Sequence, residues 1–275
     1  MKRLYYIIGI VAISVAMLAP AKAVAADAKT TAEACWADAI AAYEAKDYNL
    51  AVEKFEHIVS LGYASGDLYY NLANSYFKLG EQAAEEGLHK FSGGELGRAV
   101  LNYHRALRLN PTLEDARYNL ELAVDSTNDT EALPESFIVT IWRSICNKAH
   151  SNSWAIASLV MLGLLLALVI FYLLSNSITL RMVSFFGAIV LIIGVVVAIS
   201  FALYSKHLSE DDNRAVVICS DTTPVHASPE SASKVIRQPS QGVTVRVSRS
   251  HGDWSEIIFA DGEKGWIRSS KIENI

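Results

Sequence analysis

The feature that most constrains this chain is a pair of long apolar stretches that contain no charged side chain. No charge occurs between His150 and Arg181, and the 21 residues of segment 154–174 would form roughly 31 Å of helix, which matches the hydrocarbon core of a bilayer. Segment 182–205 is equally free of charge. Neither stretch has a polar face, which argues against two buried helices of a soluble domain. The sequence therefore predicts two transmembrane helices, over 154–174 and 182–205.

The N-terminus has the layout of a secretory signal peptide. Lys2 and Arg3 precede an apolar run over 4–18, and small residues at 21–26 suit cleavage by a signal peptidase. The alternative is an uncleaved membrane anchor, but the apolar run is short for a full span. We expect residues 1–26 to be a cleaved signal peptide.

Two spans that follow an export signal place both soluble parts of the chain on the same, exported side. The distribution of basic residues gives this orientation little support, because Arg181 falls in the inner loop while Arg143, Lys148 and Lys206 flank the outer side. We therefore base the predicted orientation on the signal peptide.

Composition and motifs argue against several functional classes. The formal net charge of −5 leaves no basic footprint for nucleic acid. Cys35, Cys146 and Cys219 lie far apart and form no CxxC pair, so neither a zinc site nor a disulfide framework is indicated. The seven histidines form no HExxH motif, and no serine lies in a nucleophile elbow. We expect a protein without catalytic activity, metal or cofactor.

Residues 31–125 contain an internal helical repeat. First-helix positions recur at an offset of 34, where Cys35, Ala39, Tyr43 and Lys46 correspond to Tyr69, Ala73, Phe77 and Gly80. Second-helix positions recur at an offset of 48, where Ala51, Phe55 and Ile58 correspond to Ala99, Tyr103 and Ala106. The difference of 14 residues predicts an insertion over 81–94, between the two helices of the second unit. We expect the small alanines to lie where paired helices cross closely.

An offset of 34 is the period of tetratricopeptide repeats (TPRs), and region 31–125 resembles that family. Segment 112–124 is then predicted to be a capping helix that covers the exposed face of the last unit. The resemblance implies a concave groove that binds a protein or peptide. The positions that would line this groove are Trp36, Ile40, Tyr43, Tyr70, Asn71, Asn74, Phe77, Lys78, Tyr118 and Asn119. Each of these side chains has a competing structural role as a brace between helices.

Residues 126–153 form a predicted linker that contains a further amphipathic element. From Pro134 onward, apolar residues between Phe137 and Ile145 recur at helical spacing, and they include Trp142. Such a helix would suit the membrane interface, with its tryptophan at headgroup depth. A helix packed under the repeats is the competing interpretation.

The C-terminal residues 214–275 change to short β-rich segments. The predicted strands cover 215–219, 243–248, 255–260 and 265–269. The tripeptide 251–253 and the dipeptide Asp261-Gly262 are turn signals between successive strands. A module of this size with this pattern is a small β-barrel.

The C-terminal module resembles bacterial SH3-like (SH3b) domains, chiefly through the turn at 252–254 and the segment 265–267. Such domains often bind cell-wall peptide, which makes Trp254 and Trp266 candidate groove residues. Both tryptophans could equally belong to the core of the barrel.

The order of segments as a whole resembles the BatE proteins of the bacterial aerotolerance (Bat) operon, particularly over residues 98–123. This resemblance implies a multidomain protein of the bacterial inner membrane, with an α-helical TPR solenoid and a small all-β SH3-like barrel on the periplasmic side. It also implies a non-catalytic scaffold whose partners are other Bat-type membrane proteins with von Willebrand type A domains. The alternative is a cell-envelope sensor or peptidoglycan-binding protein that acts through its SH3b domain.

Overall fold

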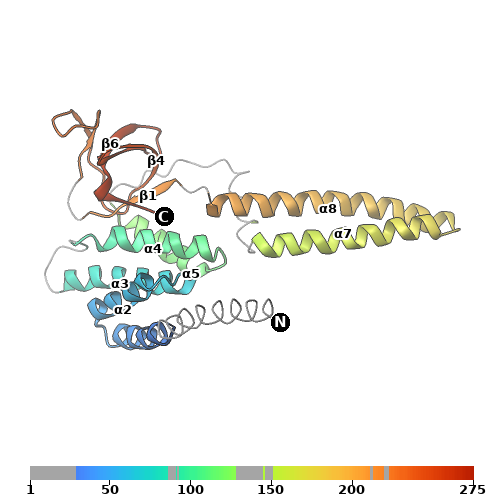
Figure 1. The fold of residues 1–275 in the computed structure, drawn as a ribbon, viewed down its shortest axis with the longest axis horizontal. Coiled ribbons are helices and arrows are strands. Elements are labelled where there is room, and N and C mark those ends of the chain that lie inside the picture. The colour runs from blue at the N-terminus through green and yellow to red at the C-terminus, as the bar shows by residue number, and fades with distance from the viewer. Residues whose placement is uncertain are drawn as a thin grey trace, which may run out of the picture.

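The computed structural model describes residues 29–85, 91, 93–127, 145, 151–210, 213–219 and 223–275. They form a helical module (29–127), a hairpin of two long helices (151–210) and a β module (214–275), as Figure 1 shows. The predicted signal peptide over 1–26 lies outside the described residues. So does almost all of the predicted linker over 126–153, including its amphipathic helix.

The helical module begins with a helix over 29–44. It continues with α2 (Tyr48–Ser60), α3 (Gly66–Glu85), α4 (Glu95–Leu109) and α5 (Glu114–Asp125). From α2 onward each helix packs against the next, and all of them contribute to one apolar core. Ala39, Ala51, Ala73 and Ala99 are each 0% exposed, which confirms that the small residues lie at the helix contacts.

Residues at the helix boundaries explain where these helices begin and end. Asp47 precedes α2, and its carboxylate accepts a hydrogen bond of 3.1 Å from the main-chain N–H of Leu50. After α2 the chain turns through Gly62, whose φ of 87° is a conformation that glycine adopts without strain. Between α4 and α5, Pro111 has no N–H with which to continue the preceding helix.

The predicted insertion over 81–94 lengthens α3 and returns an aromatic ring to the core. The helix α3 continues to Glu85, so its last turn belongs to the insertion. Phe91 is only 4% exposed, and its ring centroid lies 5.3 Å from that of Phe77. The described part of the insertion therefore covers the end of the helical core instead of forming an independent loop.

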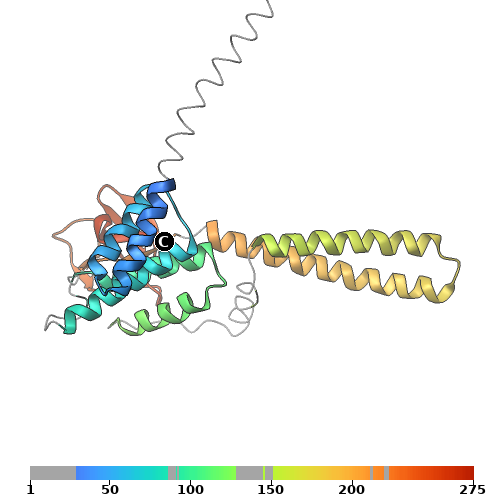
Figure 2. The ribbon, with the colours of Figure 1, turned by 90° about the horizontal axis from the view of Figure 1, so that it is seen from below.

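The two long helices form an antiparallel pair that projects from the soluble modules (Figures 1 and 2). They are α7 (Ser151–Leu174) and α8 (Ile178–Glu210), and each is long and apolar enough to cross a membrane. The second helix begins before the predicted boundary at 182. Its first turn contains Arg181, whose guanidinium donates to the main-chain oxygen of Tyr172 at 3.3 Å.

Glycines on α8 allow the two long helices to approach closely. A Cβ atom at Gly194 would lie 2.9 Å from the sulfur of Met161, and one at Gly187 would lie 3.2 Å from Leu168. Small residues at such contacts are typical of helices that associate in membranes, where apolar side chains gain nothing by leaving lipid. The large apolar side chains on the other faces are exposed, as contact with lipid requires.

The β module is a seven-stranded antiparallel sheet with the strand order β3-β2-β6-β5-β4-β1-β7. The strands are β1 (Arg214–Val217), β2 (Val225–His226), β3 (Val235–Arg237), β4 (Thr244–His251), β5 (Trp254–Ile258), β6 (Lys264–Arg268) and β7 (Ile272–Asn274). The four predicted strands correspond to β1, β4, β5 and β6. Gly252 and Gly262 have positive φ in the two predicted turns. The short strands β2, β3 and β7 were not predicted.

The helical and β modules are in direct contact through α4. Val216 of β1 and Ile275 after β7 are 0% and 4% exposed, and both belong to the apolar core of the helical module. Both modules lie at the same end of the helix hairpin, opposite the loop 175–177 (Figures 1 and 2). A membrane crossed by this hairpin would therefore leave both modules on one side.

The contact between α3 and Phe91 leads to a prediction with a definite sign. Helix propensity alone predicts that Gly80→Ala stabilises α3 by about 1 kcal/mol. The structure predicts destabilisation of about 1–3 kcal/mol, since a Cβ at Gly80 would lie 2.0 Å from a ring carbon of Phe91. Chemical denaturation of the detergent-solubilised protein measures the change. In a Phe91→Ala background the added methyl group should no longer be destabilising, and a stabilised Gly80→Ala single variant would contradict the packing.

Candidate functional site

A pocket opens on the helical module where the helix over 29–44 meets α3, α4 and α5. Its volume is about 190 Å³. The lining residues are Tyr43, Tyr70, Asn74, Phe77, Lys78, Tyr103, Asn119 and Leu122. Four of these eight residues are aromatic, two carry amide side chains, and one is a lysine at the rim.

The pocket brings together six of the predicted groove residues, namely Tyr43, Tyr70, Asn74, Phe77, Lys78 and Asn119. The other four lie elsewhere. Trp36 packs edge-to-face on Phe55, with ring centroids 5.6 Å apart, and Ile40 packs against the same core. Asn71 donates to the main-chain oxygen of Asp67 at 2.9 Å, a contact within its own helix. Tyr118 is 68% exposed on α5.

Asn74 holds three helices together at the floor of the pocket. Its Oδ1 accepts a hydrogen bond of 2.6 Å from the hydroxyl of Tyr103 on α4 and one of 2.9 Å from Nδ2 of Asn119 on α5. Among the described residues nothing accepts from the Nδ2 of Asn74. Burial raises the pKa of Tyr103, which therefore stays a neutral donor at physiological pH. The amide nitrogen of Asn74 is thus a donor that a ligand could reach.

The rim of the pocket carries an ion pair. Lys78 Nζ lies 2.8 Å from Glu81 Oε2, and the lysine side chain is 46% exposed. The hydrogen bond to Glu81 raises the pKa of Lys78, so the ammonium stays charged. Burial raises the pKa of Tyr43, and the nearby Lys78 partly opposes that shift. An apolar side chain could enter between the rings while a main-chain carbonyl meets Asn74 and a polar group meets the Lys78–Glu81 pair.

Tyr103 and Leu122 are pocket residues that the sequence prediction missed. The sequence identified Tyr103 only as the repeat position that corresponds to Phe55, and its hydroxyl places it at the floor of the pocket. Leu122 lies on the predicted capping helix and is 46% exposed, although it is apolar. An apolar residue one turn after Tyr118, on the same face of the helix, was the signal that could have identified Leu122 as a pocket residue.

The two candidate tryptophans of the β module lie on the outer face of the sheet. Trp254 pairs with Arg268 on β6, and Trp266 pairs with Glu256 on β5 and His226 on β2. Side chains alternate between the two faces along a strand, so the buried Ile257 and Ile267 point the opposite way, into the core of the barrel. Even so, Trp254 and Trp266 are only 8% and 9% exposed.

Arginine side chains cover both tryptophans. The guanidinium carbon of Arg268 lies 4.5 Å from the centroid of the Trp254 ring, and the same group donates to Ser231 Oγ at 3.0 Å. Arg249 lies 5.3 Å from the centroid of Trp266 and makes two hydrogen bonds of 2.9 Å to the carboxylate of Glu256. These contacts combine cation–π attraction with charge pairing. The tryptophans therefore form neither an open groove nor part of the barrel interior.

The described residues offer no cluster for a metal ion. No group of three or more His, Cys, Asp or Glu residues lies together in these parts of the chain. Cys35 and Cys219 are free, partly buried thiols, and Cys146 lies outside the described residues.

Residues 221–273 match the family of bacterial SH3 domains. No curated protein and no solved structure matches the chain significantly. The strand order, the two glycine turns and this match together identify the β module as an SH3-like domain of the bacterial type.

The pair formed by Arg249 and Glu256 predicts a pH dependence of stability. Hydrogen bonds from Arg249 hold the pKa of Glu256 below its ordinary value of 4.5. A carboxyl with a lowered folded-state pKa stabilises the fold above its ordinary pKa, and this contribution is lost as the pH falls through the folded-state value. We expect Arg249→Gln to lose less stability than the wild type between neutral pH and about pH 3. Urea denaturation of the full chain, followed by tryptophan fluorescence at each pH, measures the difference.

The matched control for this experiment is Arg246→Gln on the same strand. Arg246 is exposed and faces no acidic partner across β1 or β5. Its variant should keep the wild-type pH profile. Identical profiles for Arg249→Gln and the wild type would show that the pair contributes nothing to acid sensitivity.

Proposed function

We propose that this protein is a non-catalytic, membrane-anchored scaffold whose helical pocket binds a protein partner on the periplasmic side of the bacterial inner membrane. The observation that carries the proposal is the pocket between the helix over 29–44, α3, α4 and α5. Its aromatic rings, amide donor and rim ion pair suit a peptide segment better than a small metabolite, because each feature matches a different part of a polypeptide.

The helix hairpin supports the anchoring role. The two candidate spans, Asn152–Leu174 and Ile178–Tyr204, carry large exposed apolar side chains that only lipid or another membrane protein could cover. The helix ends that are not joined by the loop 175–177 lie next to both soluble modules (Figure 1). Together with the predicted signal peptide, this arrangement favours a periplasmic location for the pocket and the SH3-like module.

The identity of the partner is proposed from the resemblance to BatE proteins. On that basis the partners are other Bat-type membrane proteins with von Willebrand type A domains, in an envelope complex linked to aerotolerance. In this proposal the helical module is a TPR-type array. Its pocket would hold the partner at a fixed height above the bilayer.

Photo-crosslinking in intact membranes tests the scaffold. A photoreactive phenylalanine analogue replaces Tyr118, which is 68% exposed beside the pocket, and mass spectrometry identifies the captured protein. Replacement of Lys78 by Glu together with Leu122 by Ser should reduce the crosslinked partner roughly tenfold, because the first change reverses a charge at the rim and the second removes apolar contact surface.

The matched control for the crosslinking experiment repeats the same chemistry away from the pocket. Lys54→Glu with Leu109→Ser changes a lysine and a leucine that do not line it. This control should retain the wild-type yield. Equal yields from the pocket variant and the control would show that the pocket is not the binding site.

The second candidate function is a cell-envelope sensor or peptidoglycan-binding protein that acts through the SH3-like module. The match of residues 221–273 to bacterial SH3 domains favours it, because domains of this type are known to bind peptidoglycan or protein. Against it stands the covering of Trp254 and Trp266 by arginines.

Co-sedimentation with purified peptidoglycan separates the two functions. We expect the detergent-solubilised full chain to stay in the supernatant, because both outer-face indole rings are covered. Saturable pelleting that disappears in Trp254→Ala, while Arg246→Gln pellets normally, would favour the peptidoglycan-binding function instead.

A further inference from the structure

The helix α4 is buried on nearly all sides, although it lies near the end of the helical module. Its buried residues are Leu96, Gly97, Ala99, Val100, Leu101, Asn102, Tyr103 and Ala106. At 100° per residue these positions leave only a narrow exposed strip, which includes Arg98 and Leu109. One side of α4 packs on α3 and α5 and carries Tyr103 of the pocket, and another side packs on β1.

The contact between α4 and β1 is a contact between main chains. A Cβ atom at Gly97 would lie 2.5 Å from the carbonyl oxygen of Val217 and 2.9 Å from Cα of Ile218. No larger residue fits without separating the modules. Gln241 adds two hydrogen bonds to this contact between the modules. Its side-chain oxygen accepts from the main-chain N–H of Gly97, and its side-chain nitrogen donates to the main-chain oxygen of Phe91.

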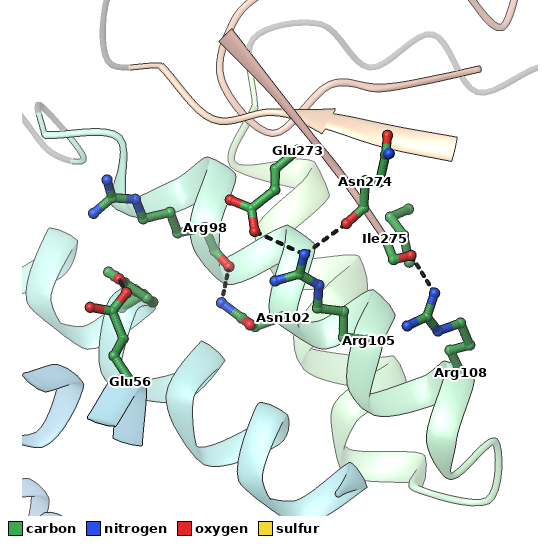
Figure 3. A network of polar contacts seen from close by, with 9 residues as sticks. Glu56, Arg98, Asn102, Arg105, Arg108, Glu273, Asn274 and Ile275 are labelled. Atoms are coloured by element: carbon green, nitrogen blue, oxygen red, sulfur yellow. Dashed lines mark hydrogen bonds and ion pairs between the residues drawn. The ribbon is translucent and has the colours of Figure 1, made fainter. Parts of the chain in front are cut away.

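Arginines of α4 hold the last strand of the sheet, as Figure 3 shows. Arg105 Nη2 donates to Glu273 Oε1 at 2.8 Å and to the main-chain oxygen of Asn274 at 2.8 Å. One turn later, Arg108 donates to the main-chain oxygen of Ile275. The Arg105 side chain is 21% exposed and that of Glu273 is 46% exposed, so solvent reaches this ion pair mainly from the Glu273 side.

An apolar contact completes this interface. Val216 and Ile275 are buried within the helical core, and Ile218 packs against it. Val216 of β1 therefore points to the helices, while its neighbours Ala215 and Val217 point into the barrel. The strand β1 separates two cores and contributes side chains to both.

We propose that the two soluble parts, 29–127 and 214–275, are one folding unit into which the membrane hairpin is inserted, and that the β1–β7 surface of the SH3-like module permanently binds α4. Domains that merely touch meet through polar side chains and can separate. The interface between α4 and the β1–β7 surface combines three kinds of contact. They are the main-chain contact at Gly97, a shared apolar core, and hydrogen bonds to the three successive residues 273–275. The proposal stands apart from the partner-binding role, because it concerns how the chain folds.

Native-state hydrogen exchange on the full chain in detergent tests this unit. Increasing urea is added, and protection is read by mass spectrometry in peptides from α3–α4 and from β5–β6. One cooperative unit loses protection in both sets at the same urea concentration. Loss at clearly separate concentrations would overturn the proposal.

Charge reversal tests the ion pair between Arg105 and Glu273. Arg105→Glu and Glu273→Arg should each make exchange in 214–218 and 269–275 roughly tenfold faster, and the double variant should recover much of that protection. Unchanged exchange in the Arg105→Glu variant, or a double variant that exchanges as fast as the singles combined, would contradict the assigned contact.

Gly97→Leu tests the close approach. Leucine favours a helix over glycine by about 1 kcal/mol, so α4 itself is not weakened. We expect faster exchange in both modules and two separate unfolding steps. Ala41→Leu, which adds a similar side chain at an exposed helical position, is the control and should match the wild type. A Gly97→Leu variant with wild-type exchange in both modules would also overturn the proposal.

Discussion

The packing of α4 is the constraint on which the rest of the soluble structure depends. This helix supplies Tyr103 to the pocket, Gly97 to the contact with β1, and Arg105 and Arg108 to the last strand of the sheet. A helix in such surroundings has no freedom to rotate, because a turn about its axis would drive side chains into the main chain of β1. The shape of the pocket wall and the position of the SH3-like module are therefore set by the same rigid element.

Much of this architecture could be predicted from local patterns, and the contacts between distant segments could not. Hydropathy indicated both long helices, and the alanine spacing indicated which faces pack. The glycine turns located the hairpins on either side of β5. By contrast, β2 and β3 have two and three residues, too few for a period-two pattern to appear. Gly97 looks like a mildly unfavourable residue inside a helix. The reason for it is the close approach of Val217, which follows the helix hairpin in sequence.

The residues of the candidate site also fall into those that local patterns predict and those that depend on contacts between distant segments. Six of the ten predicted groove residues line the pocket, because they repeat at helical positions that face one another whenever the helices stack. Trp36 and Asn71 do not line it, because each finds a nearer partner, Phe55 and the main chain of Asp67. For Trp254 and Trp266 the resemblance to SH3b domains left a choice between core and groove. Strand register placed an arginine over each ring, and no single-sequence pattern reports register between strands.

The connection between α8 and β1 ties the soluble modules closely to the helix hairpin. The helix α8 ends at Glu210 and β1 begins at Arg214, so the chain between these residues can span at most roughly 14 Å. The apolar span of α8 ends at Tyr204, and the helix continues beyond this residue to Glu210. The helix α8 also contacts α4. The folded unit is thus held beside the hairpin by a short connection and by a packing contact. A partner seated in the pocket would consequently be fixed in orientation as well as in position, as a scaffold requires and as a module on a long flexible tether would not provide.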